Sequence, residues 1–203
     1  DDSLDTDNGW SGKVQYLLVK QRDGRGDNGF EMSSAGTTVS PATNPIIANF
    51  TIVGSTKASS PGNALRLNSG HVGRFINGII IDEDECFRWQ DAGDGNATFD
   101  GVGTDPSFEN TLFDCAGGLT TEAPDTAAAV ASVGAAASNT TTTPVNLING
   151  FVNDTAAAGR AAFTDLPGNV DPFFDDVDYI GAVKNTSDDW WAEWSCGLSA
   201  DDC

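Results

Sequence analysis

Short stretches in the first half of the chain alternate between apolar and polar residues. Three of them occupy residues 29–33, 64–68 and 86–90. In each, two large apolar side chains flank one charged residue, and the charged residues are Glu31, Arg66 and Arg88. Because successive side chains of a strand point to opposite faces, this pattern predicts strands that bury the apolar pair. We expect the three charged residues to form an exposed charge ladder.

A longer strand type recurs between these short strands. Its copies occupy residues 47–53, 75–81 and 108–114. Each copy carries an asparagine at its third position, namely Asn49, Asn77 and Asn110, spaced 28 and 33 residues apart. An earlier copy at residues 13–19 has Gln15 at its third position, so we align Gln15 with the asparagines.

This repeat predicts the fold. Strand-rich repeats of about 30 residues favour a parallel β-solenoid, in which each coil stacks on the one before. Equivalent residues then lie about 4.8 Å apart, so we expect Asn49, Asn77 and Asn110 to form an amide ladder. An antiparallel sandwich is the alternative, but it would not reproduce the same asparagine register. The predicted fold class is all-β, with β-helix turns over residues 1–115.

Charge narrows the choice of partners. The chain of 203 residues has 30 acidic and 10 basic side chains, a formal charge of −20 and a pI near 4.1. Such a surface repels phosphate backbones, so we expect no nucleic acid partner. No apolar run reaches the roughly 18 residues of a membrane-spanning helix. Aspartate accounts for 24 of the acids, and a surface rich in aspartate suits a salty or calcium-containing exterior.

The cysteines indicate an oxidising compartment. There are four, at Cys86, Cys115, Cys196 and Cys203, without a CxxC motif and with His71 as the single histidine. Two disulfides therefore fit better than a zinc site, although free buried thiols are the alternative. Three pairings are possible. We favour Cys86–Cys115, between strand-like segments, and Cys196–Cys203, which closes a short loop.

One acidic loop is a candidate calcium site. It offers oxygen ligands at nearly alternate positions, from Asp94, Asn96, Asp100 and Asp105. The loop is not an EF-hand, because Phe99 replaces the glycine expected at the sixth place and no flanking helices are predicted. The residues 82–85 form a second acidic cluster. A solvated acidic turn is the alternative at both places.

The second half of the chain has a different composition. We interpret residues 116–152 as an Ala/Thr-rich insertion, more consistent with a loop than with a short helix, whose end at 145–152 could return a strand to the stack. The residues 153–203 form a tail rich in aromatic residues, which we expect to cap the last coil and to be clipped by a disulfide. At the N-terminal edge we expect another protein chain, or an upstream β-helix segment, to cover the open strands.

Several segments together resemble a family of bacterial secreted and outer-membrane surface lipoproteins, mostly known as hypothetical proteins. The matching segments are Asp1–Asp5, Asn8–Gly12, Gln15–Gln21, Asp27–Glu31, Asn49–Ser55, Phe173–Val183, Asp188–Trp190 and Trp194. The resemblance implies a right-handed parallel β-helix at the bacterial cell surface or outside the cell. Family members carry a lipidated cysteine and further coils upstream, so the resemblance implies that this sequence is the C-terminal portion of a longer protein. It supplies no established catalytic residues.

Two functions follow as hypotheses. The first is a non-catalytic extracellular or cell-surface module that associates with another chain, a surface glycan or a matrix, assisted by calcium and by self-assembly. The second is a β-helix polysaccharide lyase or glycosidase, in which Arg66, Arg74 or Arg88 would act beside Asp82 and Asp84. The acidic surface disfavours the second, because it repels anionic polysaccharides.

Overall fold

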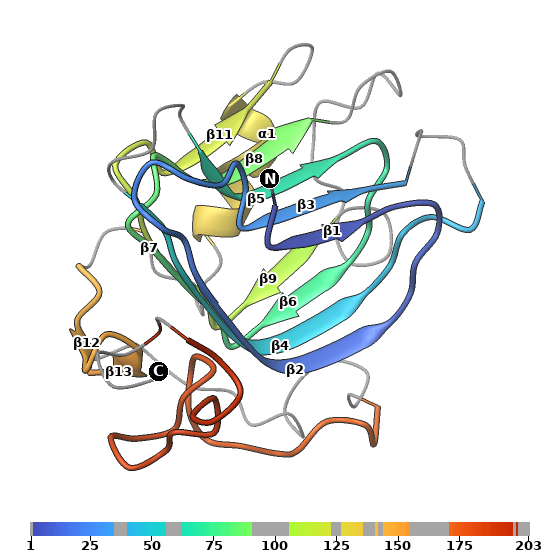
Figure 1. Ribbon diagram of the computed structural model, residues 1–203. Helices are drawn as coiled ribbons and strands as arrows, with labels where there is room; N and C mark the ends of the chain where they lie inside the picture. The colour runs from blue at the N-terminus through green and yellow to red at the C-terminus, as the bar shows by residue number, and fades with distance from the viewer. Residues whose placement is uncertain are drawn as a thin grey trace.

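The computed structural model describes residues 2–34, 40–55, 62–90, 106–122, 127–135, 141, 144–154, 171–196 and 198. Its strands coil into a parallel β-helix around a shared apolar core (Figure 1). One sheet, sheet A, has the order β1 (Leu4–Thr6), β3 (Phe30–Ser33), β5 (Asn63–Asn68), β8 (Glu85–Gln90) and β11 (Leu119–Thr121). Sheet B comprises β2 (Lys13–Lys20), β4 (Ile46–Val53), β6 (Arg74–Ile76), β7 (Ile79–Ile81), β9 (Ser107–Glu109) and β10 (Leu112–Asp114).

Every strand pair within these two sheets is parallel. Phe30 is in register with Leu65, and Leu65 with Phe87. The predicted β-helix is therefore confirmed, and the predicted alignment of the short strands holds in sheet A. The stack extends beyond residue 115, because β11 pairs with β8.

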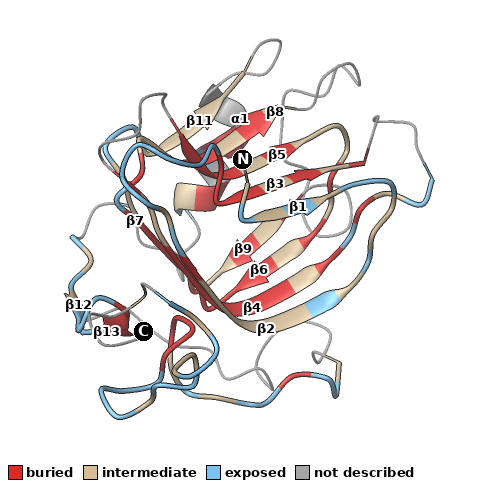
Figure 2. Ribbon diagram, in the orientation of Figure 1, coloured by how far each residue is buried: buried red, intermediate tan, exposed pale blue. Residues whose placement is uncertain are grey.

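The core forms where the inward side chains of successive coils stack. The large inward residues of β3, β5 and β8 are at most 1% exposed, and Figure 2 shows buried positions along the inner strands. Aromatic rings of sheet B continue this stack, with centroids 6.1 Å apart for Phe50 and Phe75 and 4.9 Å apart for Phe75 and Phe108. Burial of each such side chain stabilises the fold by about 1.5–3 kcal/mol.

Each coil of sheet B bends at one residue with a left-handed backbone. Asn49, Asn77 and Asn110 have φ of 49°, 54° and 50°, and asparagine tolerates this conformation better than most residues. These three residues stack in one column, which we call the asparagine column. Tyr16, with φ of 62°, is its fourth member. Our alignment of Gln15 with Asn49 was wrong by one position, because β2 pairs Gln15 with Ala48.

The Ala/Thr-rich segment contains a helix, α1 (Ala127–Ala135), where we expected a loop. Alanine has the highest helix propensity, and a spacing of three residues places Val130 and Val133 on one face. Both valines are buried in the main core, and α1 covers the last described coil beside β11. The predicted return strand is also wrong, because β12 (Leu147–Ile148) and β13 (Val152–Asn153) form a separate antiparallel pair.

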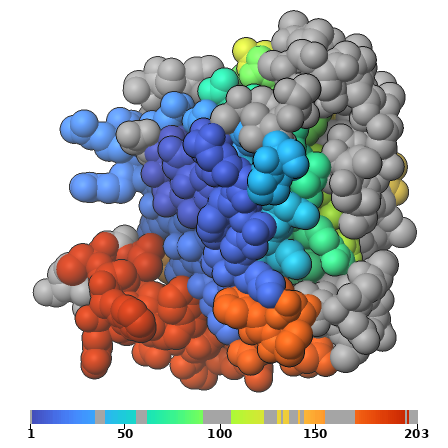
Figure 3. Space-filling model, turned by 90° about the vertical axis from the view of Figure 1, so that its right-hand side faces the viewer, coloured from blue at the N-terminus to red at the C-terminus, as the bar shows by residue number. Residues whose placement is uncertain are grey.

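The tail covers the side of the stack. Residues 171–196, which we call the strap, lie along the outer face of sheet B (Figure 3). Phe174 packs on Ala48 and Ile76, and Ile180 is buried against Ile79 and its neighbours. The described tail therefore covers the coils laterally, whereas we had expected it at the last coil, which α1 occupies.

Cys86 and Cys115 form a disulfide, with Cα atoms 5.3 Å apart. Cys196 is also disulfide-bonded, but Cys203 of the predicted second pair lies outside the described residues. Within those residues, the structure contains no helix with the length and apolar character needed to cross a membrane.

Candidate functional site on the charged face

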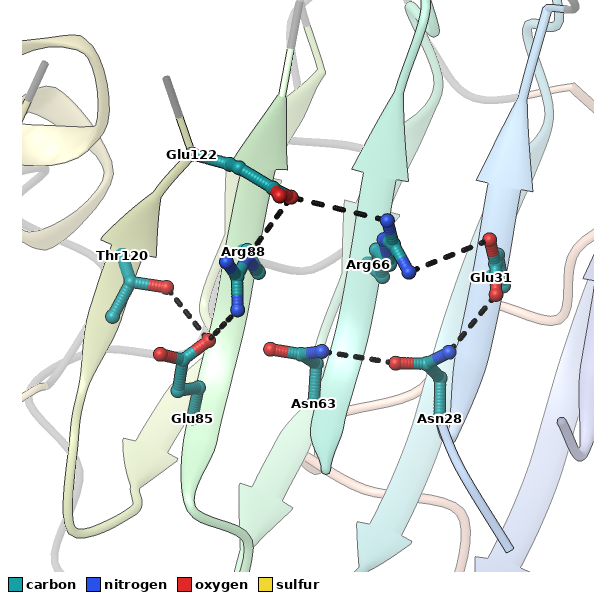
Figure 4. A network of polar contacts seen from close by, with 8 residues as sticks. All are labelled: Asn28, Glu31, Asn63, Arg66, Glu85, Arg88, Thr120 and Glu122. Carbon is teal, nitrogen blue, oxygen red and sulfur yellow. Dashed lines mark hydrogen bonds and ion pairs between the residues drawn. The ribbon is translucent and has the colours of Figure 1, made fainter. Parts of the chain in front are cut away.

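The outer face of sheet A carries a ladder of charged side chains. The strand register places Glu31 of β3 beside Arg66 of β5, and Arg66 beside Arg88 of β8. Thr120 of β11 follows Arg88 in the same row. Figure 4 shows these side chains on neighbouring strands, together with Glu122, which follows β11. We call this surface the charged face.

Carboxylates hold both arginines of the charged face. Arg66 lies 4.0 Å from Glu31 and 3.8 Å from Glu122. Arg88 lies 3.4 Å from both Glu85 and Glu122, so Glu122 bridges the two guanidinium groups. These side chains are 22–37% exposed, and ion pairs with such access to water contribute only about 0–1 kcal/mol each.

A second polar column runs along the corner where each coil enters sheet A. The side-chain amide of Asn63 donates to Asn28 Oδ1 at 3.0 Å. Asn28 in turn donates to Asp2 Oδ1 at 2.8 Å and to Glu31 Oε2 at 2.9 Å. We missed this column in the sequence. The available signal was the fixed offset, because Asn28, Asn63 and Glu85 each stand two residues before a buried apolar residue.

Three carboxylates meet at the edge of the charged face. Oxygen atoms of Asp2, Asp27 and Glu31 all lie within 4.8 Å of one another. Burial raises the pKa of Glu31, and the neighbouring aspartates raise it further, while Arg66 opposes them. Carboxylate oxygens suit a hard cation such as calcium, but three of them supply only part of its usual shell of about six to eight ligands. Asn28 also already donates to two of the three carboxylates.

The calcium loop that we proposed from the sequence cannot be placed. Asp94, Asn96, Asp100 and Asp105 lie outside the described residues. The second acidic cluster, residues 82–85, is divided by the fold. Glu85 belongs to the charged face, whereas Glu83 is buried.

Glu83 occupies a corner between the two sheets, in a space bordered by glycines. A Cβ atom on Gly54 would stand 2.1 Å from Glu83 Cγ, and one on Gly62 would stand 3.0 Å from Glu83 Oε2. Burial raises the pKa of Glu83 to about 7, against hydrogen bonds from the backbone of Ser55 and Asp84. The side chain is 4% exposed, so it does not face a substrate on the charged face.

The asparagine column and His71 do not belong to the charged face. Asn110 Nδ2 donates to Asn77 Oδ1 at 3.1 Å, whereas Asn49 Nδ2 donates to the backbone of the strap. His71 is fully buried against Phe75, and burial lowers its pKa to about 3. It is therefore neutral and has no access to a bound substrate.

The geometry of the charged face favours binding over proton transfer. An arginine guanidinium is protonated and has no acceptor site, so it must first lose a proton before it can take one from a substrate. Here Arg66 and Arg88 each lie within ion-pair distance of two carboxylates. A polymer could reach these guanidinium groups only by displacing glutamate side chains.

Comparison with known proteins bears on the fold. Residues 1–165 match the model of one family, described as a pectate-lyase-like β-helix domain. No curated protein and no solved structure matches the chain.

Proposed function

Because the chain belongs to the family of pectate-lyase-like β-helix domains, we propose a role for its β-helix as a scaffold. The protein is a non-catalytic extracellular or cell-surface module, and it associates through its charged face and its open edge with another chain, a surface glycan or a matrix. Calcium assists this association.

The pairing of the two arginines carries the proposal. Each guanidinium on the charged face is neutralised by glutamates, and Glu122 is shared between them. Weak surface pairs of this kind can be exchanged for groups of a partner at little cost. The charged face is therefore suited to reversible electrostatic contact.

The first coil supports association with another chain. β1 and β2 lie at the edge of their sheets, with pairing on one side only among the described strands. The inward side chains Leu4, Val14 and Leu17 are only partly buried there, unlike their equivalents in the inner coils. An edge strand of this kind is a ready template for a further parallel strand.

An extracellular or bacterial-surface location agrees with the Cys86–Cys115 disulfide and with the net charge of −20. The resemblance to surface lipoproteins favours the same location. The cluster of Asp2, Asp27 and Glu31 is one place where calcium could act.

A second candidate function is polysaccharide lysis, which the description of the family favours. In such a reaction a basic residue removes a proton next to a uronate carboxyl group, while calcium binds that carboxyl group. Arg88 is the residue of the charged face that could take this part, once Glu85 and Glu122 move away.

One assay separates the two functions. The protein is incubated with polygalacturonate and calcium, and the absorbance of unsaturated products is followed. We expect no product from the wild-type protein or from Arg88→Ala. Product that forms with the wild type and disappears with Arg88→Ala would establish the lyase instead.

Size-exclusion chromatography with and without a chelator tests the association. We expect a larger species in the presence of calcium. A monomer that is indifferent to the chelator would contradict both calcium-assisted association and stacking between subunits.

A further inference from the structure

Two hollows adjoin on the surface formed by the strap. The larger, of about 470 Å³, is lined by residues that include Tyr16, Tyr179 and Asp188. The smaller, of about 230 Å³, is lined by residues that include Trp191 and again Asp188. Asn185 also lines both, so the two hollows meet at Asn185 and Asp188, and we call the pair of hollows the groove. The groove lies over sheet B and is separate from the charged face.

Aromatic rings stand in both halves of the groove. Tyr16 and Tyr179 line the larger hollow, and Phe151 and Trp191 line the smaller one. Trp191 is held by an edge-on contact with Phe151, with ring centroids 5.4 Å apart. Rings that are fixed before binding contribute contact area at a small entropic cost.

Tyr16 is an outlier in the fold. It occupies the left-handed bend where the three inner coils of sheet B have asparagine. A bulky residue in this conformation is strained, and such strain is concentrated at functional sites. Its hydroxyl donates to Asp175 Oδ2 at 3.1 Å and also contacts Tyr179. The strained backbone therefore places a fixed ring at the groove.

Asn49 of the asparagine column and the adjacent Gln15 bind the strap, which contributes most of the other residues that line the groove. Asn49 Nδ2 donates to the carbonyl oxygen of Tyr179 at 3.0 Å. Gln15 exchanges two hydrogen bonds with the backbone of Asp175, at 2.8 and 3.0 Å. The loop of the strap from Lys184 to Asp188 is also preorganised, because Asp188 Oδ2 accepts a hydrogen bond from the backbone nitrogen of Lys184 at 2.8 Å.

The chemistry of the lining selects the ligand. Aromatic rings pack against the apolar C–H face of a pyranose, while amides, hydroxyls and carboxylates hydrogen-bond its hydroxyl groups. Asp188 and Asp189 line the groove, against one lysine, Lys184. The chain has a net charge of −20, so an anionic sugar would be repelled. We propose that this groove binds an uncharged oligosaccharide that spans both hollows.

Affinity electrophoresis tests this proposal with the full chain. The gels contain a soluble β-linked glucan, a galactomannan or dextran, and a fourth contains polygalacturonate as the anionic comparison. We expect at least one neutral polymer to retard the protein, and polygalacturonate to have no such effect. If none of the three neutral polymers retards it, the proposal is wrong.

Matched variants locate the binding. Tyr179→Ala and Trp191→Ala should each weaken binding about tenfold, through loss of a stacking ring. Trp194→Ala is the control, because Trp194 is 84% exposed and lines neither hollow, and it should change the affinity by less than about twofold. Tyr179→Phe should retain binding, and circular dichroism checks that every variant is folded.

The variants also separate this proposal from the function of the charged face. Retardation that survives in both folded alanine variants but is lost in Arg88→Ala would assign sugar binding to the charged face and overturn the groove. The lyase assay is a separate measurement, because it follows product formed from polygalacturonate and its dependence on Arg88, whereas electrophoresis follows binding to neutral polymers.

Discussion

The outer faces of the two sheets carry opposite kinds of side chain, although the same coils build both. The outer face of sheet A presents Glu31, Arg66 and Arg88 to solvent, whereas that of sheet B presents apolar residues such as Ile76 and Ile79, which the strap covers. The comparison shows that the two sides of one parallel β-helix can carry different kinds of surface. One side makes exchangeable surface contacts, and the other anchors a long segment.

The largest expected loss of stability is on the side of the molecule where the strap is attached to sheet B. Asn49→Ala should lower the free energy of unfolding by about 4 kcal/mol, because the carbonyl groups of Tyr179 and Gly181 lose a buried donor and alanine disfavours the left-handed bend. Urea denaturation followed by tryptophan fluorescence measures this loss.

Asn49→Gly is the control for the backbone. Glycine accepts a φ of 49° without strain, so its loss should be smaller and should report the hydrogen bonds alone. An alanine variant within about 1 kcal/mol of the wild type would mean that Asn49 does not anchor the strap.

The next effect concerns Glu83, at the corner that joins the two sheets. The folded state raises the pKa of Glu83 from 4.5 to about 7, so between these values the folded state holds a proton that the unfolded state has lost. The contribution of Glu83 to stability is therefore largest below pH 4.5 and should fall by roughly 3 kcal/mol as the pH rises through 7.

Glu83→Gln should remove this fall, because glutamine has no proton to lose. Thermal unfolding across this pH range measures it, with Glu193→Gln as the matched control, since Glu193 is exposed. If both variants keep the wild-type slope, other groups cause the pH dependence.

The stacking of the coils could be predicted because the repeat length and the apolar–polar alternation of the strands can be read from the sequence, and together they fit one register. The register of Glu31, Arg66 and Arg88 follows directly from the apolar pairs beside them. We missed Tyr16 because we expected a ladder of amide side chains and therefore aligned Gln15, the nearest amide, with Asn49. The amide of Gln15 does reach Asn49, at 3.1 Å, but from the neighbouring position of the strand.

The candidate sites were less predictable, since they depend on contacts between distant segments. Glu122 joins the charged face from 34 residues beyond Arg88, and nothing in its local sequence marks it. The groove joins Tyr16 to Tyr179 across most of the chain. In the same way, α1 is favoured by two valines that reach the core, which the alanine-rich composition alone does not reveal.

The smallest expected effect lies on the charged face. Glu122→Gln removes the carboxylate that bridges Arg66 and Arg88 and should cost only about 0.5–1 kcal/mol, because water solvates the freed guanidinium groups. The difference from the wild type should shrink further in 1 M salt, where screening extends over about 3 Å. Urea titrations at low and high salt measure both quantities. A loss above about 2 kcal/mol, insensitive to salt, would mean that the charged face is a rigid structural element like the asparagine column. A partner could then not displace its ion pairs cheaply, and the contrast between the two sides would disappear.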